Sequence, residues 1–169
     1  MDDITIRQAE TCDVDQVTKI WADNSALALG FAPNDGCDYQ EYFAQKIANQ
    51  TAAFKIWVAE STEGSILGWQ SLLPTRNNPA ILNLTAESST YVALDHRYKG
   101  VGTAVMRHAL RQAERSRLQW VIGFTLASNL PMLKVAHSLG WKEVGRVPTA
   151  LKPPISDDLL VLMYQVPAG

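Results

Sequence analysis

The segment Tyr91-Val-Ala-Leu-Asp-His-Arg-Tyr-Lys-Gly-Val-Gly-Thr103 combines residue types that suit anion binding. It reads as a strand that enters a tight turn containing Arg97, Gly100 and Gly102, after which a helix begins. Glycines let the backbone approach a ligand closely, and the free N–H groups and dipole of a first helical turn favour an anion. Arg97 and Lys99 add positive charge. The spacing predicts an anion-binding turn, although the same glycines also suit a turn that only packs closely.

Two common phosphate-binding loops do not match this segment. A Walker A loop places Lys and then Ser or Thr directly after its last glycine, whereas Thr103 and Ala104 follow Gly102. A dinucleotide fingerprint needs three glycines near the first strand of a βαβ unit, whereas this turn has two and lies late in the chain.

The elements that position the turn follow from apolar periodicity. Asp13 and Gln16 have the spacing of a capping box that opens a first helix. Helices are further expected at about 39–47, 102–115 and 130–139, and strands at about 4–7, 56–60, 66–72, 84–94, 120–126, 143–147 and 159–166. This order predicts a mixed sheet with helices on both faces.

Composition narrows the class of protein. The chain has 169 residues with 47% hydrophobic residues, which predicts a single domain over 1–169. A net charge of −2 argues against a general nucleic-acid binder. The apolar stretches are too short for a membrane span, no signal peptide is recognised at the N-terminus, and the two cysteines form no CxxC pair. We expect a soluble cytoplasmic protein without a metal site.

Two motifs resemble one enzyme family. Arg97-x-x-Gly100-x-Gly102 after a strand is similar to the R/Q-x-x-G-x-G/A signature of the GNAT superfamily of acetyl-coenzyme A-dependent N-acetyltransferases. Asn129 followed by Leu139-Gly140-Trp141 resembles the family's N…LGF pattern, and the element order agrees from Ile4 to Val166.

The resemblance implies a fold and a coenzyme site. The fold would be an α/β GNAT fold, with a central, mostly antiparallel sheet of about seven strands and a parallel pair that splays apart where its strands end, near Leu94 and Leu126. The pantetheine arm of acetyl-CoA would enter this gap and bond the backbone around Tyr91, Val92 and Leu94, and Asn129 would contact the arm. The pyrophosphate would lie on the amides of Arg97, Tyr98, Lys99, Gly100, Val101, Gly102 and Thr103.

The branch of the family also suggests catalytic residues. Glu87-Ser-Ser-Thr-Tyr-Val92, followed by Asp95-His-Arg97, is similar to the phosphinothricin and methionine-sulfone acetyltransferases. By this resemblance Glu87 would be the general base and a backbone N–H near Val92 would stabilise the oxyanion. Arg76 would bind the carboxylate of the substrate. The plainer alternatives are an exposed strand carboxylate and a solvated loop arginine.

The sequence departs from the family at two places. Ala136 stands where many GNAT enzymes have a tyrosine and this branch a histidine that protonates the leaving thiolate. His137 is one residue further along and, at about 100° per helical residue, would face elsewhere, so water remains as the proton source. Pro153 and Pro154 replace a segment rich in Gly and Lys/Arg, so the acceptor can differ from phosphinothricin or methionine sulfone.

The expected activity is acetyl transfer from acetyl-CoA to the primary amine of a small amino-acid-like acceptor. A protein or peptide acetyltransferase and a non-catalytic acyl-CoA-binding regulatory module remain alternatives. Neither nucleic acid nor membrane is expected as a partner, and a homodimer stays open.

Overall fold

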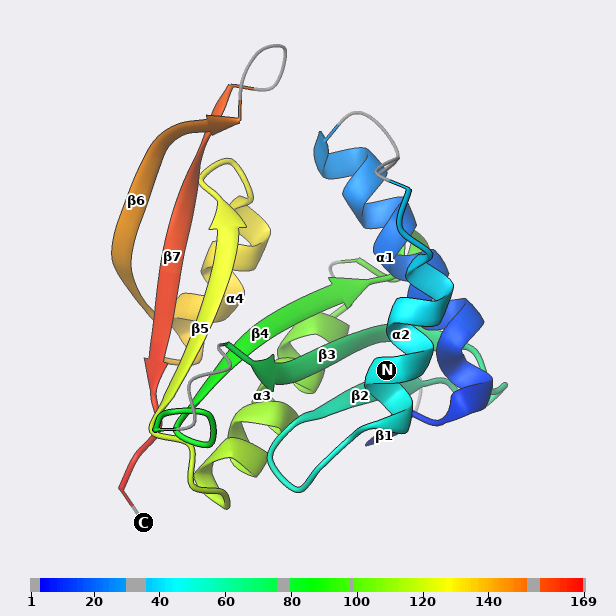
Figure 1. The fold of residues 1–169 in the computed structure, drawn as a ribbon. Coiled ribbons are helices and arrows are strands. Elements are labelled where there is room, and N and C mark those ends of the chain that lie inside the picture. The colour runs from blue at the N-terminus through cyan, green and yellow to red at the C-terminus, as the bar shows by residue number, and fades with distance from the viewer. Residues whose placement is uncertain (1–3, 30–35, 76–79, 98, 152–155, 169) are drawn as a thin grey trace.

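The sheet has seven strands. In the computed structural model, which describes residues 4–29, 36–75, 80–97, 99–151 and 156–168, the strand order is β1-β2-β3-β4-β5-β7-β6 (Figure 1). All neighbouring pairs are antiparallel except β4–β5, which confirms the mostly antiparallel mixed sheet. The strands are β1 (Thr5–Gln8), β2 (Lys55–Glu60), β3 (Ile66–Pro74), β4 (Thr85–Val92), β5 (Trp120–Leu126), β6 (Lys142–Leu151) and β7 (Asp157–Gln165).

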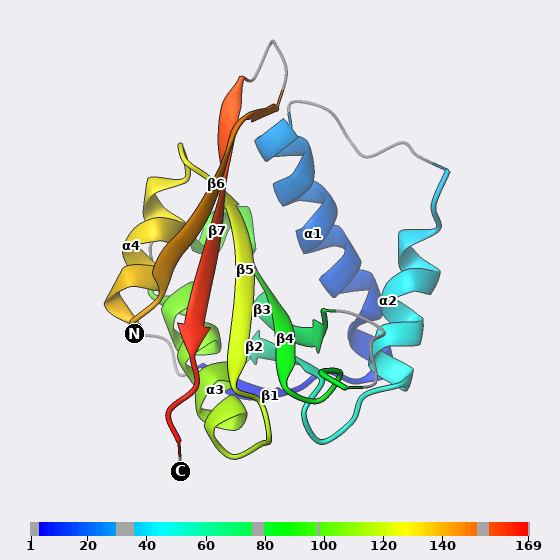
Figure 2. The same ribbon diagram turned by 60° about the vertical axis from the view of Figure 1, so that its left-hand side comes forward.

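Helices cover both faces of the sheet (Figure 2). Helices α1 (Val14–Leu29) and α2 (Tyr39–Ala48) pack on one face, and α3 (Val101–Glu114) and α4 (Leu130–Ser138) on the other. Helix α3 forms because apolar residues recur at helical spacing, with Val101, Val105 and Ala109 buried. Gly100 begins it at φ +85°, a conformation that glycine adopts without steric cost.

Trp69 joins α1 to the middle of the sheet. It lies on β3 and is only 2% exposed, and its indole N–H donates to the backbone oxygen of Val17 at 3.0 Å. Its ring packs against Tyr91 on β4, with centroids 4.8 Å apart. This contact fixes the position of α1 against the second half of β4.

The two parallel strands separate part-way along their length. Their register runs from Thr85 opposite Trp120 to Ser88 opposite Gly123. Beyond that pair, β4 remains bonded to β3 and β5 to β7, so the sheet divides into two diverging halves (Figure 1). The expected splay is confirmed, and we call the space between residues 89–92 and 124–126 the β4–β5 opening.

The expected capping box of the first helix is wrong. Asp13 instead accepts the backbone N–H of Glu10 at 2.8 Å and binds the Arg7 guanidinium, at 2.7 and 2.9 Å. Gln16 accepts the backbone N–H of Ile66 at 2.9 Å. Asp13 therefore closes a capping box with Glu10 on the short 3₁₀ turn Thr11–Asp13 that precedes α1.

Candidate active site

A cavity of about 700 Å³ follows the β4–β5 opening and reaches the N-terminal ends of α3 and α4. We call it the larger cavity. The predicted coenzyme residues that line it are Tyr91, Val92, Arg97, Gly100, Val101, Gly102, Thr103 and Asn129. Leu94 and Lys99 are exposed and lie outside its wall. Tyr98 falls outside the described residues, as does Arg76.

The start of α3 leaves backbone donors at the wall of this cavity. The N–H groups of Val101, Gly102 and Thr103 have no carbonyl four residues earlier within the helix to bond, and they carry the positive end of the helix dipole. A Cβ at Gly102 would meet Cγ2 of Val92 at 3.3 Å, so the wall is already tight there. The geometry therefore suits a large anion held by backbone amides.

The pairing of β4 decides which backbone groups face the opening. The N–H of Ala93 donates to the oxygen of Leu67 at 2.9 Å. Backbone groups of an antiparallel strand alternate in direction, so those of Thr90 and Val92 turn away from β3 and toward the opening. Tyr91 directs its own N–H and C=O groups to β3, so they do not face the opening as those of its two neighbours do. Thr90 was missed because this assignment requires the register.

Asn24 on α1 connects two of the predicted residues. Its Nδ2 group donates to the backbone oxygens of Ile20 at 2.8 Å and Val92 at 3.0 Å. Its Oδ1 atom accepts from Nη2 of Arg97 at 2.6 Å. Asn24 lines the wall as well, and no motif around it indicates this role in the sequence.

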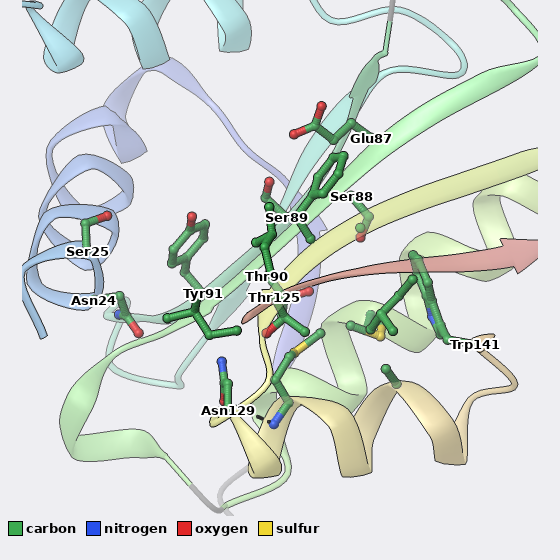
Figure 3. A pocket seen from close by; sticks show the side chains of 18 residues that line it. Asn24, Ser25, Glu87, Ser88, Ser89, Thr90, Tyr91, Thr125, Asn129 and Trp141 are labelled. Atoms are coloured by element: carbon green, nitrogen blue, oxygen red, sulfur yellow. Dashed lines mark hydrogen bonds between the residues drawn. The ribbon is translucent and has the colours of Figure 1, made fainter. Parts of the chain in front are cut away.

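A second cavity, the smaller cavity, has a volume of about 400 Å³ and joins the first. The residues that both walls share are Asn24, Thr90, Tyr91, Leu126, Asn129 and Met132. From there it runs along α4, with Asn129 at one end of the helix and Trp141 beyond the other, while Glu87 lies on β4 (Figure 3). The two cavities therefore meet at the β4–β5 opening.

Glu87 lines the smaller cavity on the same side of β4 as Tyr91 (Figure 3). The side chain is exposed, and it lies where this cavity meets the surface. Its negative charge acts on two tyrosines. Burial raises the pKa of Tyr91 and of Tyr42, and the Glu87 carboxylate raises both further. Both phenols consequently stay protonated at neutral pH.

Helix α4 places Ala136 and His137 on different sides. Ala136 is fully buried and lines the smaller cavity, whereas His137 is exposed and lines neither cavity. Asn129 caps the helix, because its Oδ1 accepts the N–H of Met132 at 3.3 Å. The indole N–H of Trp141 is buried in the same wall without a hydrogen-bond partner among the described residues.

The comparison with known families decides the class of enzyme. The model of the GNAT acetyltransferase domain matches residues 3–142. The chain belongs to this family. YwnH of Bacillus subtilis, whose name suggests a phosphinothricin acetyltransferase, is 30% identical to this GNAT enzyme over 148 residues, covering 86% of this chain and 88% of YwnH. The L-methionine sulfoximine/L-methionine sulfone acetyltransferase of Pseudomonas aeruginosa is 26% identical over 147 residues, with coverages of 85% and 83%.

Solved structures agree with the fold of this GNAT enzyme. The yncA structure from Salmonella typhimurium, determined with acetyl-CoA, superposes with a TM-score of 0.84 at 24% identity, covering 98% of this chain and 95% of that chain. The phosphinothricin acetyltransferase of Sinorhizobium meliloti in complex with acetyl-CoA gives 0.82 at 17% identity, covering 96% and 88%. In the described ranges, no helix has both the length and the apolar composition that crossing a bilayer requires.

Proposed function

We propose that this GNAT enzyme transfers the acetyl group of acetyl-CoA to the primary amine of a small amino-acid-like acceptor, and that residues 1–169 form one acetyltransferase domain. The observation that carries the proposal is the meeting of the two cavities at the β4–β5 opening. The larger cavity has the anion-binding amides, and the smaller one has a carboxylate. The names of the relatives, which refer to phosphinothricin and to L-methionine sulfoximine or sulfone, support an amino-acid-like acceptor.

The larger cavity would hold acetyl-CoA. The amides at the start of α3 would hold the pyrophosphate. In the opening, backbone groups of Thr90 would bond the pantetheine arm, while the N–H of Val92 would reach the thioester carbonyl. Asn129 would add a side-chain contact from the start of α4. Structures of two neighbours with acetyl-CoA support this choice of donor.

The chemistry needs a neutral amine, because an ammonium has no lone pair to attack a carbonyl carbon. Glu87 would take the proton from the ammonium, directly or through water, and the amine nitrogen would then attack the thioester. The N–H of Val92, which faces the opening, would donate to the carbonyl oxygen as negative charge develops there. Such a donor contributes about 2.7–4 kcal/mol to lowering the barrier. Ala136 has no proton to give, so water would protonate the thiolate.

The experiment follows thiol release from acetyl-CoA with a panel of acceptors. The panel contains phosphinothricin, methionine sulfone, methionine sulfoximine, the common amino acids and short peptides. We expect turnover with one or more free amino acids and little with peptides. Turnover confined to peptides would contradict the proposed acceptor class, and thioester binding without any acylated amine would contradict catalysis on these amines.

A further inference from the structure

One face of the second half of the sheet is left largely uncovered by the described helices. Helices α1 and α2 pack on β2, β3 and β4, while α3 and α4 lie on the other side of the sheet (Figure 2). The ring of Phe124 on β5 is 52% exposed on the uncovered face. The apolar residues of β5 and β7 that share this face are accessible and belong to none of the core clusters of the described residues: Ile122, Phe124, Leu126, Leu159, Val161 and Met163.

The uncovered face is the one that carries Glu87. The register of the parallel pair sets Glu87 beside Ile122, and side chains alternate along a strand. Phe124 and Leu126 therefore point to the same side of the sheet as Glu87. The face continues onto β7, where Leu159 pairs with Leu126. An acceptor whose amine lies beside Glu87 is thus on the same side of the sheet as these apolar side chains.

Phe124 lies level with the part of β4 where the reaction would occur. Continuing the register of the parallel pair past its end would set Phe124 opposite position 89 and Leu126 opposite position 91 of β4. Both positions fall between Glu87 and Val92, whose N–H would donate to the thioester carbonyl. An amine held between the base and the thioester would therefore have the two β5 side chains across the β4–β5 opening.

On the Glu87 side of the sheet, the smaller cavity is polar along one wall and apolar along the other. Helix α1 and β4 supply hydroxyl groups and the Glu87 carboxylate (Figure 3), whereas β5 and β7 supply Phe124, Leu126 and Leu159, which we call the apolar wall. Among the described residues that line this cavity, Glu87 alone is charged at neutral pH. Its carboxylate attracts an ammonium group, and no described cation in the lining would balance an anionic side chain. Burial of hydrocarbon on the apolar wall is favourable, so the cavity suits an amine with an uncharged, apolar side chain.

We propose that the apolar wall binds the side chain of the acceptor, and that the preferred acceptors are amino acids with large apolar side chains, such as phenylalanine and leucine. Phe124 determines this specificity, because its accessible ring can pack against an aromatic or branched side chain. The inference rests on the proposed function and narrows its acceptor class. The reaction is the same: the amine nitrogen bonds the carbonyl carbon, the carbon–sulfur bond breaks, and the thiolate takes a proton and leaves as coenzyme A.

The test measures kcat/KM with acetyl-CoA for glycine, alanine, leucine, phenylalanine, serine, aspartate and phosphinothricin. Each methylene buried on the wall should raise kcat/KM by up to about fourfold, so leucine and phenylalanine should exceed alanine by about tenfold or more. Equal values for alanine and phenylalanine, or a preference for aspartate or phosphinothricin, would overturn the inference without contradicting the proposed function. If no amine is acylated, the proposed function fails, while the calorimetric Kd values of alanine and phenylalanine still decide the role of the wall.

Variants at Phe124 separate the apolar wall from other causes. Phe124→Ala should lower kcat/KM for phenylalanine by about tenfold or more, keep that for alanine within about threefold and leave the Kd of acetyl-CoA near wild type, whereas Phe124→Leu should keep most of the preference. Val144→Ala is the matched control, because Val144 is also exposed, at 51%, and lines neither cavity. Its series should equal that of wild type.

Equal losses of Phe124→Ala for all acceptors would contradict the proposal. If gel filtration then shows that the same variant dissociates a dimer, the uncovered face binds a second copy of the chain and not the acceptor. If Phe124→Ala does not fold, Phe124→Leu and the wild-type acceptor series still decide between the outcomes.

Discussion

Ser88 on β4 and Gly123 on β5 are the last pair that the two parallel strands form before they separate. Three features of the site depend on this pair. Thr90 and Val92 beyond it keep backbone groups that β5 no longer bonds, and Glu87 stands one residue before it on the opposite face. The smaller cavity passes the pair itself, because both residues line that cavity. Under the proposed function, the end of the pairing would determine where a thioester and an amine meet.

Replacing Glu87 tests the proposed base. Glu87→Gln keeps the shape and removes the basicity, so kcat at pH 7 should fall by about 10²–10⁴ while the Kd of acetyl-CoA stays near wild type. The deficit should shrink at high pH, where the amine loses its proton without help. Kinetics and calorimetry measure the two quantities. Glu63→Gln, a matched change of an exposed turn carboxylate, should have no effect, and ordinary turnover of Glu87→Gln at pH 7 would remove the base from the mechanism.

A series at Gly102 tests the anion site. Gly102→Ala introduces a Cβ at 3.3 Å from Cγ2 of Val92 and should weaken acetyl-CoA binding moderately. Gly102→Glu adds bulk and negative charge where the pyrophosphate would lie, and should abolish calorimetric binding. Arg111→Glu, which changes the charge on the exposed side of the same helix, should bind normally. A folded Gly102→Glu protein with unchanged affinity would locate the pyrophosphate elsewhere.

Asn24→Ala tests the link between α1 and the proposed coenzyme site around Val92 and Arg97. The change removes the hydrogen bonds to the backbone oxygen of Val92 and to Arg97. One or two hydrogen bonds at about 1 kcal/mol each correspond to a Kd for acetyl-CoA that is about 5- to 30-fold weaker. Asn49→Ala is the matched control, because Asn49 bonds the carbonyl four residues earlier in α2, at 2.8 Å, as Asn24 does in α1. Equal Kd values of the two variants for acetyl-CoA would show that the Asn24 side chain supports only its own helix.

The parts that the sequence predicts well are those encoded over short distances. The strand expected at 120–126 is β5 to the residue, and the helix expected at 102–115 differs from α3 by one residue at each end. Periodicity and glycine positions are local signals, and the motif at Arg97 and Gly100 is local as well. The long strand ends at Val92 rather than near Leu94, because a short 3₁₀ turn follows it.

The parts that it does not predict depend on contacts between distant segments. The bond from Arg97 to Asn24 joins residues that are 73 positions apart, and Asp13 turns to Arg7 because β1 brings the guanidinium beside it. The direction in which the N–H and C=O groups of Thr90 point depends on the register of β4 with β3. The exposure of Glu87 depends on where the smaller cavity opens. No local pattern contains this information.

His137→Ala tests whether the histidine next to the family position takes part in the reaction. The exposed imidazole lines neither cavity, so kcat should stay within about threefold of wild type across the pH range. Losing an acid or base usually costs about 10²–10⁴ in rate. A fall of a hundredfold or more at constant acetyl-CoA affinity would show that His137 reaches the leaving thiolate.

The Arg7–Asp13 pair makes a prediction about stability and pH. Asp13 is 3% exposed, and the hydrogen bonds from Arg7 hold the pKa of its carboxyl below the usual 3.8. A carboxyl with a lowered folded pKa contributes stability that is fully present above its unfolded pKa and is lost as the pH falls through the folded pKa. Asp13→Asn should therefore lower the free energy of unfolding at pH 7 by about 1.5–3 kcal/mol, the range for a hydrogen bond to a charged group.

The difference in the free energy of unfolding between wild type and Asp13→Asn should then shrink as the pH is lowered below about 4. At that pH the wild-type carboxyl becomes protonated and loses its charge. Urea unfolding of both proteins between pH 7 and pH 3 measures it. Asp23→Asn is the matched control, because Asp23 pairs with Lys19 at 2.6 Å on the surface of α1, where both side chains are well exposed. Its loss should cost only about 0.3–0.5 kcal/mol. A difference for Asp13→Asn that stays constant with pH would show that shape, and not the charge held by Arg7, makes Asp13 stabilising.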